Sequence, residues 1–240
     1  MPADLTDIVR RDGARYLTAY FAEPPARTYT GRWFETLAGG GDRDDAWDRL
    51  TGDDLIAVEM LDVEFPAAAR WDLIDGALGA KINEHLANIP RSVEITDPEA
   101  AELFCDKGDA NQAHESLKNE KYDGRKGPRR LGYVIAGKLL ARKRPYLIPV
   151  YDSRIKCQFG RPDAFWISLY ERFTGDGGAL RAALVDARST AGVSDLTSVL
   201  RALDVVLWMR HEALFGKCRT TKSCLGYNTV SLTLPPVGQP

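Results

Sequence analysis

The sequence predicts a mainly α-helical protein. In several segments of the 240-residue chain, apolar residues recur at three- and four-residue steps, which is the spacing of one helix face. Many of these segments begin or end at residues typical of helix termini, and alternating patterns typical of strands are few. Hydrophobic residues make up 44% of the chain, as in ordinary globular proteins. We therefore expect one helical domain over residues 1–216.

Three helix starts carry recognisable caps. Thr51 and Asp54 have the spacing of a capping box, Asp97 precedes a proline that suits a first turn, and Ser194 is the expected cap of the last helix. The predicted helices cover residues 4–21, 52–61, 67–88 as one continuous helix, a segment from 98, 133–141, 162–173, 179–188 and 195–214.

The charge of the whole chain excludes one class of protein. A net charge of −2 and a pI near 6.0 are not those of a globally basic nucleic-acid binder, but they allow a local basic face. Residues 118–143 form a candidate anion-binding surface, with an ordinary solvated face as the alternative. The cations of this segment are Lys118, Lys121, Arg125, Lys126, Arg129, Arg130, Lys138, Arg142 and Lys143.

Several other features are predicted to be absent. The sequence has no apolar run of about 18 residues and no signal-peptide pattern at its start, so we expect a cytoplasmic protein without a membrane partner. The four cysteines form no Cys-x-x-Cys and the three histidines are isolated, so we predict neither a metal nor a cofactor.

Residues 217–240, rich in turn-forming residues, are predicted to be a C-terminal tail and a candidate for disorder.

Residues 127–152 are the segment most typical of a function. A basic turn leads into a short helix, a second turn and an extended run that ends at Asp152. The turn at Leu131 and Gly132 precedes a helix N-terminus, where backbone N–H groups point outward, and with Arg129 and Arg130 it suits a phosphate. The alternative is a turn that only joins two helices, beside solvated arginines.

This segment resembles a known superfamily. Leu131-Gly-Tyr-Val-Ile-Ala136, followed by Pro149-Val-Tyr-Asp152, is similar to the helix-hairpin-helix and aspartate signature of base-excision DNA glycosylases, especially the alkylpurine type. The resemblance implies a multi-helix, glycosylase-like domain with a helix-hairpin-helix-like motif. The chain also resembles a bacterial family of unknown activity with the pattern Lys-Leu-Leu-Ala-x-Lys-Arg-Pro-x-Leu-x-Pro-Val-Tyr-Asp.

The chain departs from the glycosylase pattern at two positions near the hairpin. Arg130 stands where the first hairpin glycine belongs, although Gly132 matches the second. Val134 stands where bifunctional members carry a Schiff-base lysine. The resemblance therefore implies hydrolysis without a lyase step.

The resemblance assigns the chemistry to Asp152. A carboxylate there would stabilise the positive charge that develops on a sugar as its base departs, and would orient the attacking water. The alternative is a helix N-cap, and one residue can serve as both. Lys138 is expected to be a solvated or phosphate-facing residue, and the alternative is an amine nucleophile, which would require burial and a lowered pKa. Aromatic residues, which either stack on an extruded base or pack in the helical core, are Tyr133, Tyr151 and Trp166.

Three functions remain open at the level of sequence. The first is a DNA-binding, monofunctional glycosylase that hydrolyses the N-glycosidic bond of a damaged or modified purine, associated with the nucleoid. The second is a non-catalytic nucleic-acid-binding module of the same fold. The third is an enzyme that acts on a free nucleoside or another small molecule, which the acidic net charge favours. DNA is the expected partner, and the sequence leaves protein partners unknown.

Overall fold

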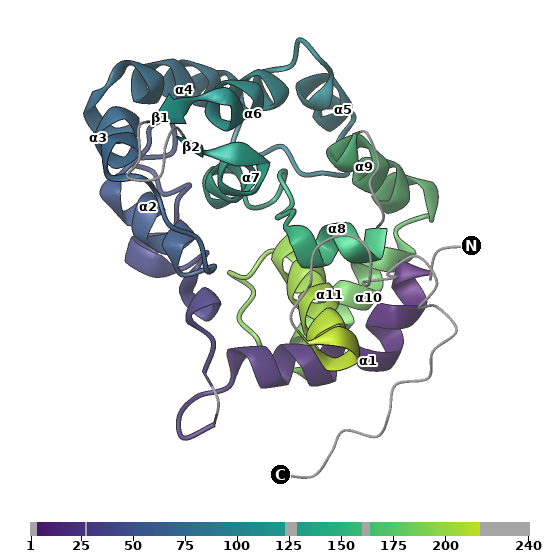
Figure 1. The fold of residues 1–240 in the computed structure, drawn as a ribbon. Helices are drawn as coiled ribbons and strands as arrows, with labels where there is room; N and C mark the ends of the chain where they lie inside the picture. The colour runs from purple at the N-terminus through teal and green to yellow at the C-terminus, as the bar shows by residue number, and fades with distance from the viewer. Residues whose placement is uncertain (1–3, 27, 123–128, 160–163, 217–240) are drawn as a thin grey trace.

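The structure, a computed structural model, describes residues 4–26, 28–122, 129–159 and 164–216 (Figure 1). Helices make up nearly all the regular structure of this part of the chain, so the mainly α fold class is confirmed. Its two short strands, β1 (Lys121–Tyr122) and β2 (Arg129–Arg130), form one antiparallel pair. The predicted tail, residues 217–240, lies outside the described residues.

The helices form two packed groups (Figure 1). In the first group, α6 packs against both α4 and α7, α3 packs against α4, and α2 packs against α7. In the second, α1 packs against α10 and α11, and α8 packs against α11. The first group contains α2 (Gly52–Glu59), α3 (Ala67–Asp75), α4 (Ala77–Asn88), α5 (Pro98–Phe104), α6 (Asp109–Asn119) and α7 (Gly132–Lys143). The second contains α1 (Leu5–Phe21), α8 (Ser153–Phe159), α9 (Phe165–Gly175), α10 (Ala179–Thr190) and α11 (Val199–Phe215).

Irregular chain connects the two groups. Residues 22–51 lead from α1 to α2 and contain two 3-10 turns, η1 (Thr30–Trp33) and η2 (Leu37–Gly39). Contacts between α5 and α9 also join the groups. One cluster of buried apolar side chains includes residues of both, from Leu5 in α1 to Met209 in α11.

Several predicted helix starts are confirmed. The Asp4 carboxylate accepts the Thr6 N–H at 2.9 Å and caps α1. Thr51 and Asp54 form a capping box at α2, in which each side chain accepts the backbone N–H of the other residue. Pro98 occupies the first turn of α5, where its missing N–H costs nothing.

The prediction of one helix over residues 67–88 is wrong, because the chain breaks at Gly76 into α3 and α4. Asp72 causes the break: its carboxylate accepts the Leu78 N–H at 3.2 Å and satisfies the first turn of α4. The apolar face predicted for this segment is also incomplete, since Trp71 is 65% exposed.

The last helix begins later than predicted. Its N-cap is Ser198, which accepts the Arg201 N–H at 3.0 Å, and the predicted cap Ser194 lies in a preceding turn. The Ser198 N–H and hydroxyl both donate to the Glu35 carboxylate, at 2.8 and 2.6 Å. Burial raises the pKa of Glu35 to about 7. The cap thus depends on a residue far away in sequence, which local patterns do not show.

The predicted helix-hairpin-helix motif is not seen in the described residues. The strand pair β1–β2 lies between α6 and α7, where the motif would have a short turn. The predicted helix over residues 133–141 is confirmed as α7. It begins at Gly132, whose φ of +77° favours glycine, although a Cβ there would meet no atom within 4 Å. The backbone conformation, rather than crowding, requires this glycine.

Candidate functional site

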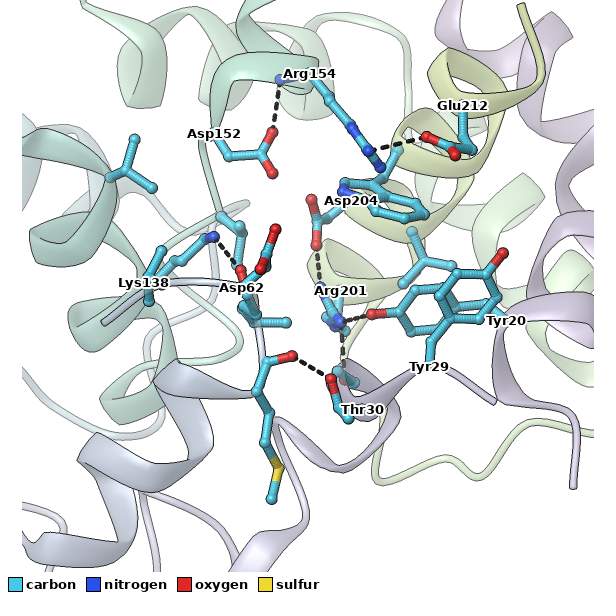
Figure 2. Close-up of a pocket in the computed structure, with 18 of the residues that line it drawn as sticks. Tyr20, Tyr29, Thr30, Asp62, Lys138, Asp152, Arg154, Arg201, Asp204 and Glu212 are labelled. Atoms are coloured by element: carbon cyan, nitrogen blue, oxygen red, sulfur yellow. Dashed lines mark hydrogen bonds and ion pairs between the residues drawn. The ribbon is translucent and has the colours of Figure 1, made fainter. Parts of the chain in front are cut away.

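A pocket of about 660 Å³ lies between the two groups of helices (Figure 2). The end of α1, the chain around η1, the loop after α2, the middle of α7, residues 150–154 and the pocket-facing side of α11 line it. Its charged side chains are Asp62, Lys138, Asp152, Arg154, Arg201, Asp204 and Glu212. A pocket of this size suits a small ligand or one nucleoside.

Lys138 lies on α7 and is only 4% exposed. Its Nζ donates to the Leu61 carbonyl oxygen at 2.8 Å, and its ammonium group faces Asp152 and Asp204 across the pocket (Figure 2). Burial lowers the pKa of Lys138, whereas Asp152 and Asp204 oppose that change. The expectation that this lysine is solvated is wrong, and its predicted contact with a phosphate is untested.

Arg201 and Asp204 form a buried ion pair one turn apart on α11. The other guanidinium nitrogen of Arg201, NH2, donates to the Tyr20 hydroxyl at 2.7 Å and to the Gly31 carbonyl at 2.9 Å. A Cβ at Gly31 would lie 2.2 Å from the Tyr20 hydroxyl oxygen, so only glycine allows this approach. The pair is therefore fixed by α1 and the chain at η1.

The Asp204 carboxyl group has an unusual environment. Burial raises its pKa to about 6, with Arg201 and Lys138 lowering it and Asp152 raising it further. Its Oδ2 receives the Arg201 guanidinium, but its buried Oδ1 has no hydrogen-bond partner among the described residues. Figure 2 shows Asp204 facing the space below Asp152.

Asp152 caps α8 and also lines the pocket. Its Oδ1 accepts the backbone N–H groups of Arg154 at 2.9 Å and Ile155 at 3.0 Å. The N-cap alternative is thus confirmed, and the cap fixes the carboxylate at the pocket (Figure 2). The other role predicted for Asp152, stabilising positive charge on a sugar, is not tested by these contacts.

An aromatic wall closes one side of the pocket. Tyr20 and Tyr29 are stacked with ring centroids 4.9 Å apart, and Trp208 packs edge-on against Tyr29 at 5.6 Å. The Arg154 guanidinium lies 3.8 Å from the centroid of the Trp208 ring and forms an ion pair with Glu212 at 2.9 Å. Aromatic faces of this kind suit a planar heterocycle.

The aromatic residues predicted for a base pocket lie elsewhere. Tyr151 stacks on Phe165 at 4.0 Å and contacts Tyr133 at 5.9 Å. Trp166 packs against Phe104 at 5.3 Å and contacts the His114 ring. None of the three predicted residues lines the pocket between the helix groups. They pack instead around α5, α7 and α9.

The predicted phosphate-binding turn is only partly available. The Leu131 N–H donates to the Glu120 carbonyl at 3.2 Å, and the Leu131 side chain is buried. Arg130 is exposed, with its guanidinium 3.2 Å from the Asn119 side-chain oxygen. Arg129 pairs through its backbone with Tyr122. The contact of Arg129, Arg130, Leu131 and Gly132 with a nucleic acid is untested.

The cations at the end of α7 do not form a surface. Arg142 and Lys143 are at most 1% exposed, and both bind the buried Asp54 carboxylate, at 3.3 and 3.2 Å. They also donate to the carbonyl oxygens of Phe34 and Ala46, both at 2.6 Å. The prediction of a continuous anion-binding face through residue 143 is therefore wrong, because its C-terminal cations are structural.

Most of the charged and aromatic residues that line the pocket were not indicated by the sequence: Tyr20, Tyr29, Asp62, Arg154, Arg201, Asp204, Trp208 and Glu212. One signal was present: Arg201 and Asp204 are three residues apart within an otherwise apolar helical segment, where charged residues need partners. The tyrosines and Asp62 carried no such signal, because their meeting depends on how the two helix groups pack.

Metal and membrane sites are not found in the part of the chain that the structure describes. It contains no group of three or more His, Cys, Asp or Glu side chains that could hold a metal ion. None of its helices is long and apolar enough to span a bilayer.

The fold and the site define a mainly helical protein with a charged, aromatic-walled pocket between two helix groups. The chain belongs to a family of unknown function, DUF6308, whose model matches residues 13–211. The match includes α7, Asp152 and the pocket-lining part of α11 up to residue 211. No curated protein and no solved structure matches the chain.

Proposed function

We propose that the protein is a hydrolase that separates a purine-type base from its sugar, with Asp152 as the essential carboxylate. The observation that carries the proposal is the position of Asp152, held through Oδ1 by the N-terminal amides of α8 at a nucleoside-sized pocket. A carboxylate fixed in this way needs no reorganisation when positive charge develops beside it.

The proposed reaction is a hydrolysis. As the bond between C1′ and the base nitrogen breaks, its electron pair goes to the base, and the sugar becomes positively charged. Asp152 stabilises that charge and accepts a proton from the water that attacks C1′. Lys138 is held by the Leu61 carbonyl and interacts electrostatically with Asp152 and Asp204. The products are the free base and the sugar, which now carries a hydroxyl group at C1′.

The aromatic wall supports a base as the leaving group. Tyr29 and Trp208 line the pocket beside Arg154, whose guanidinium covers one face of Trp208, so a base would stack on ring surface that these contacts leave uncovered. Stacking of a base on an aromatic side chain contributes about 1–3 kcal/mol.

A free nucleoside is the substrate that the geometry favours. Lys138, Arg142 and Lys143 are buried, so much of the predicted cationic surface cannot contact a DNA backbone, and the net charge is −2. A damaged purine in DNA is the second candidate substrate, because Arg130 is exposed next to the turn at Gly132. In that case, the nucleotide would be flipped into the same pocket.

The test is release of free base, followed by liquid chromatography, from 7-methylguanosine, guanosine and duplex DNA containing 7-methylguanine. Asp152→Asn retains a side-chain oxygen for the α8 cap, so we expect a folded variant whose release falls at least about 100-fold. Asp186→Asn, at an exposed position on α10, is the matched control and should retain wild-type release. Unchanged release by Asp152→Asn would refute the assignment.

A DNA-binding measurement distinguishes the two candidate substrates, a free nucleoside and a damaged purine in DNA. Fluorescence anisotropy at low salt compares duplex binding by the wild type with that by the double variant Arg129→Ala, Arg130→Ala. Nucleoside cleavage without DNA binding assigns the free substrate. DNA binding that the double variant weakens, with no release from any substrate, would instead indicate a non-catalytic nucleic-acid-binding module.

A further inference from the structure

Asp204 is the pocket residue whose hydrogen bonds are incomplete. The residue is 6% exposed, and its Oδ2 is bound by Arg201. Its Oδ1 is buried without a partner among the described residues. A buried carboxylate oxygen without a donor costs free energy, and most such atoms in folded proteins are satisfied. The atom therefore indicates either a proton on the carboxyl group or a donor on a bound ligand.

The carboxyl group of Asp204 is also rigid. Arg201, which binds its Oδ2, is itself held by the Tyr20 hydroxyl and the Gly31 carbonyl, so three elements of the chain fix the position of Asp204. Rigidity of this kind is typical of a group that acts on a ligand in one orientation. The charged and titratable groups around it in the pocket are Tyr20, Asp62, Lys138, Asp152, Arg154, Arg201 and Glu212.

We propose that Asp204 is the general acid that protonates the departing base, in the pocket that Asp152 also lines. This assignment rests on the proposed function. Asp204 and Asp152 both line the pocket and face a common space (Figure 2). Two carboxyl groups in one site can divide acid and base roles when their surroundings differ. Here Asp152 is bound by helix amides, whereas Asp204 is buried beside an arginine.

The proton balance of the step is complete. The proton leaves Asp204 Oδ1 for a ring nitrogen of the base, while the electron pair of the bond to C1′ moves onto the base. Water adds its hydroxyl group to C1′ and gives its proton to Asp152. Solvent then removes the proton from Asp152 and returns one to Asp204, so no reactant other than water is needed.

The chemistry of Asp204 suits this role near neutral pH. Burial raises the pKa of Asp204 to about 6, with a further increase from Asp152. A share of the carboxyl groups therefore remains protonated near neutral pH, and a general acid works best when its pKa lies near the operating pH.

Guanosine and 7-methylguanosine form a matched pair of substrates for the test. The methylated base already carries a positive charge and leaves without a proton, whereas guanine needs one. We expect Asp204→Asn to lower kcat/KM about 100-fold or more for guanosine and less than about 10-fold for 7-methylguanosine. Asp152→Asn should lower both, since charge develops on the sugar in each reaction.

The pH dependence of the wild-type protein gives a test that needs no variant. For guanosine, kcat/KM should fall tenfold per pH unit above about pH 6, as Asp204 loses its proton. For 7-methylguanosine this decline should be missing over the pH range in which its own N1–H stays protonated and the base stays cationic. Thermal unfolding of Asp204→Asn checks its fold, and if the variant does not fold, the two wild-type profiles decide.

The outcomes separate this inference from the proposed function. Three outcomes would overturn the role of Asp204 and leave Asp152 as the essential carboxylate. The first is release of base from 7-methylguanosine but not from guanosine. The others are an equal loss of kcat/KM for the two nucleosides in folded Asp204→Asn, and wild-type pH profiles of the same shape for both. No release from any substrate would overturn both assignments.

Discussion

Removal of the Asp54 carboxylate should strongly destabilise the fold. Asp54 is fully buried and binds two equally buried cations, Arg142 Nε at 3.3 Å and Lys143 Nζ at 3.2 Å. It also accepts the Thr51 N–H at 3.0 Å in the α2 capping box. Asp54→Ala would leave both cations without their carboxylate and open the box.

The expected loss follows from these contacts. Removing one partner of a buried ion pair costs about 3–5 kcal/mol, because the other charge remains buried. Loss of the capping contact adds about 1 kcal/mol. Arg142 and Lys143 keep their bonds to backbone carbonyls, so the lower end of the range is appropriate. We expect Asp54→Ala to lower the free energy of unfolding by about 4 kcal/mol.

Urea unfolding followed by circular dichroism measures this change. Asp53→Ala is the matched control, because Asp53 lies in the same helical turn with its side chain 45% exposed and makes only a 3.4 Å contact with Arg43. Its effect should be below about 0.5 kcal/mol. Asp54→Asn preserves shape and should lie between the two. A loss for Asp54→Ala as small as that for Asp53→Ala would refute the reasoning.

Three further predictions concern other parts of the molecule. Burial raises the pKa of Glu35 from 4.5 to about 7. At about 1.4 kcal/mol per pH unit, this shift contributes about 3 kcal/mol to the free energy of unfolding, which is fully present below about pH 4.5 and is lost as the pH rises through about 7. Glu35→Gln should therefore reduce the decline in unfolding free energy over that interval, and an unchanged slope in urea titrations would contradict the cause. Gly132→Ala should destabilise the protein by about 1–2 kcal/mol because of its positive φ, whereas Gly137→Ala within the same helix should be neutral or stabilising; equal effects in thermal unfolding would contradict this difference. Trp208→Ala should weaken binding of guanine at least about fivefold in calorimetry, while Trp71→Ala, at a 65% exposed position on α3, should not.

The sequence predicted the elements that depend on neighbouring residues. The capping box of Thr51 and Asp54 uses contacts within one turn, and Pro98 suits a first turn by its own backbone geometry, so both patterns were sufficient. The side-chain cap predicted at Asp97 is wrong, because its carboxylate accepts the Glu94 N–H and no N–H of α5. The start of α11 was placed too early because Ser198 is supported by Glu35, a residue from another part of the chain. The break at Gly76 was missed because it depends on a side-chain contact: the Asp72 carboxylate accepts the Leu78 N–H, which a continuous helix would bond to a backbone carbonyl.

The candidate site was predicted less completely than the fold. Asp152 was identified because its motif is local, and its cap to α8 is local as well. The basic segment was interpreted as a surface because sequence shows the sign of a charge and not its burial. Arg142 and Lys143 instead lie against carbonyl oxygens from other segments. Asp204 can be recognised as a site residue only in the folded structure, where α11 packs so that Asp204 and Asp152 line the same pocket.

The cations at the end of α7 have a consequence for the order of folding. Arg142 and Lys143 bind the carbonyl oxygens of Phe34 and Ala46, and Arg144, the residue after α7, binds that of Trp47. These carbonyls lie in the irregular chain between α1 and α2, where no long helix or sheet binds them. This chain cannot bury its carbonyls before α7 is in place. Docking of α7 and ordering of residues 34–50 should therefore be one cooperative event, and amide hydrogen exchange in that loop should require the same opening as exchange in the helix core.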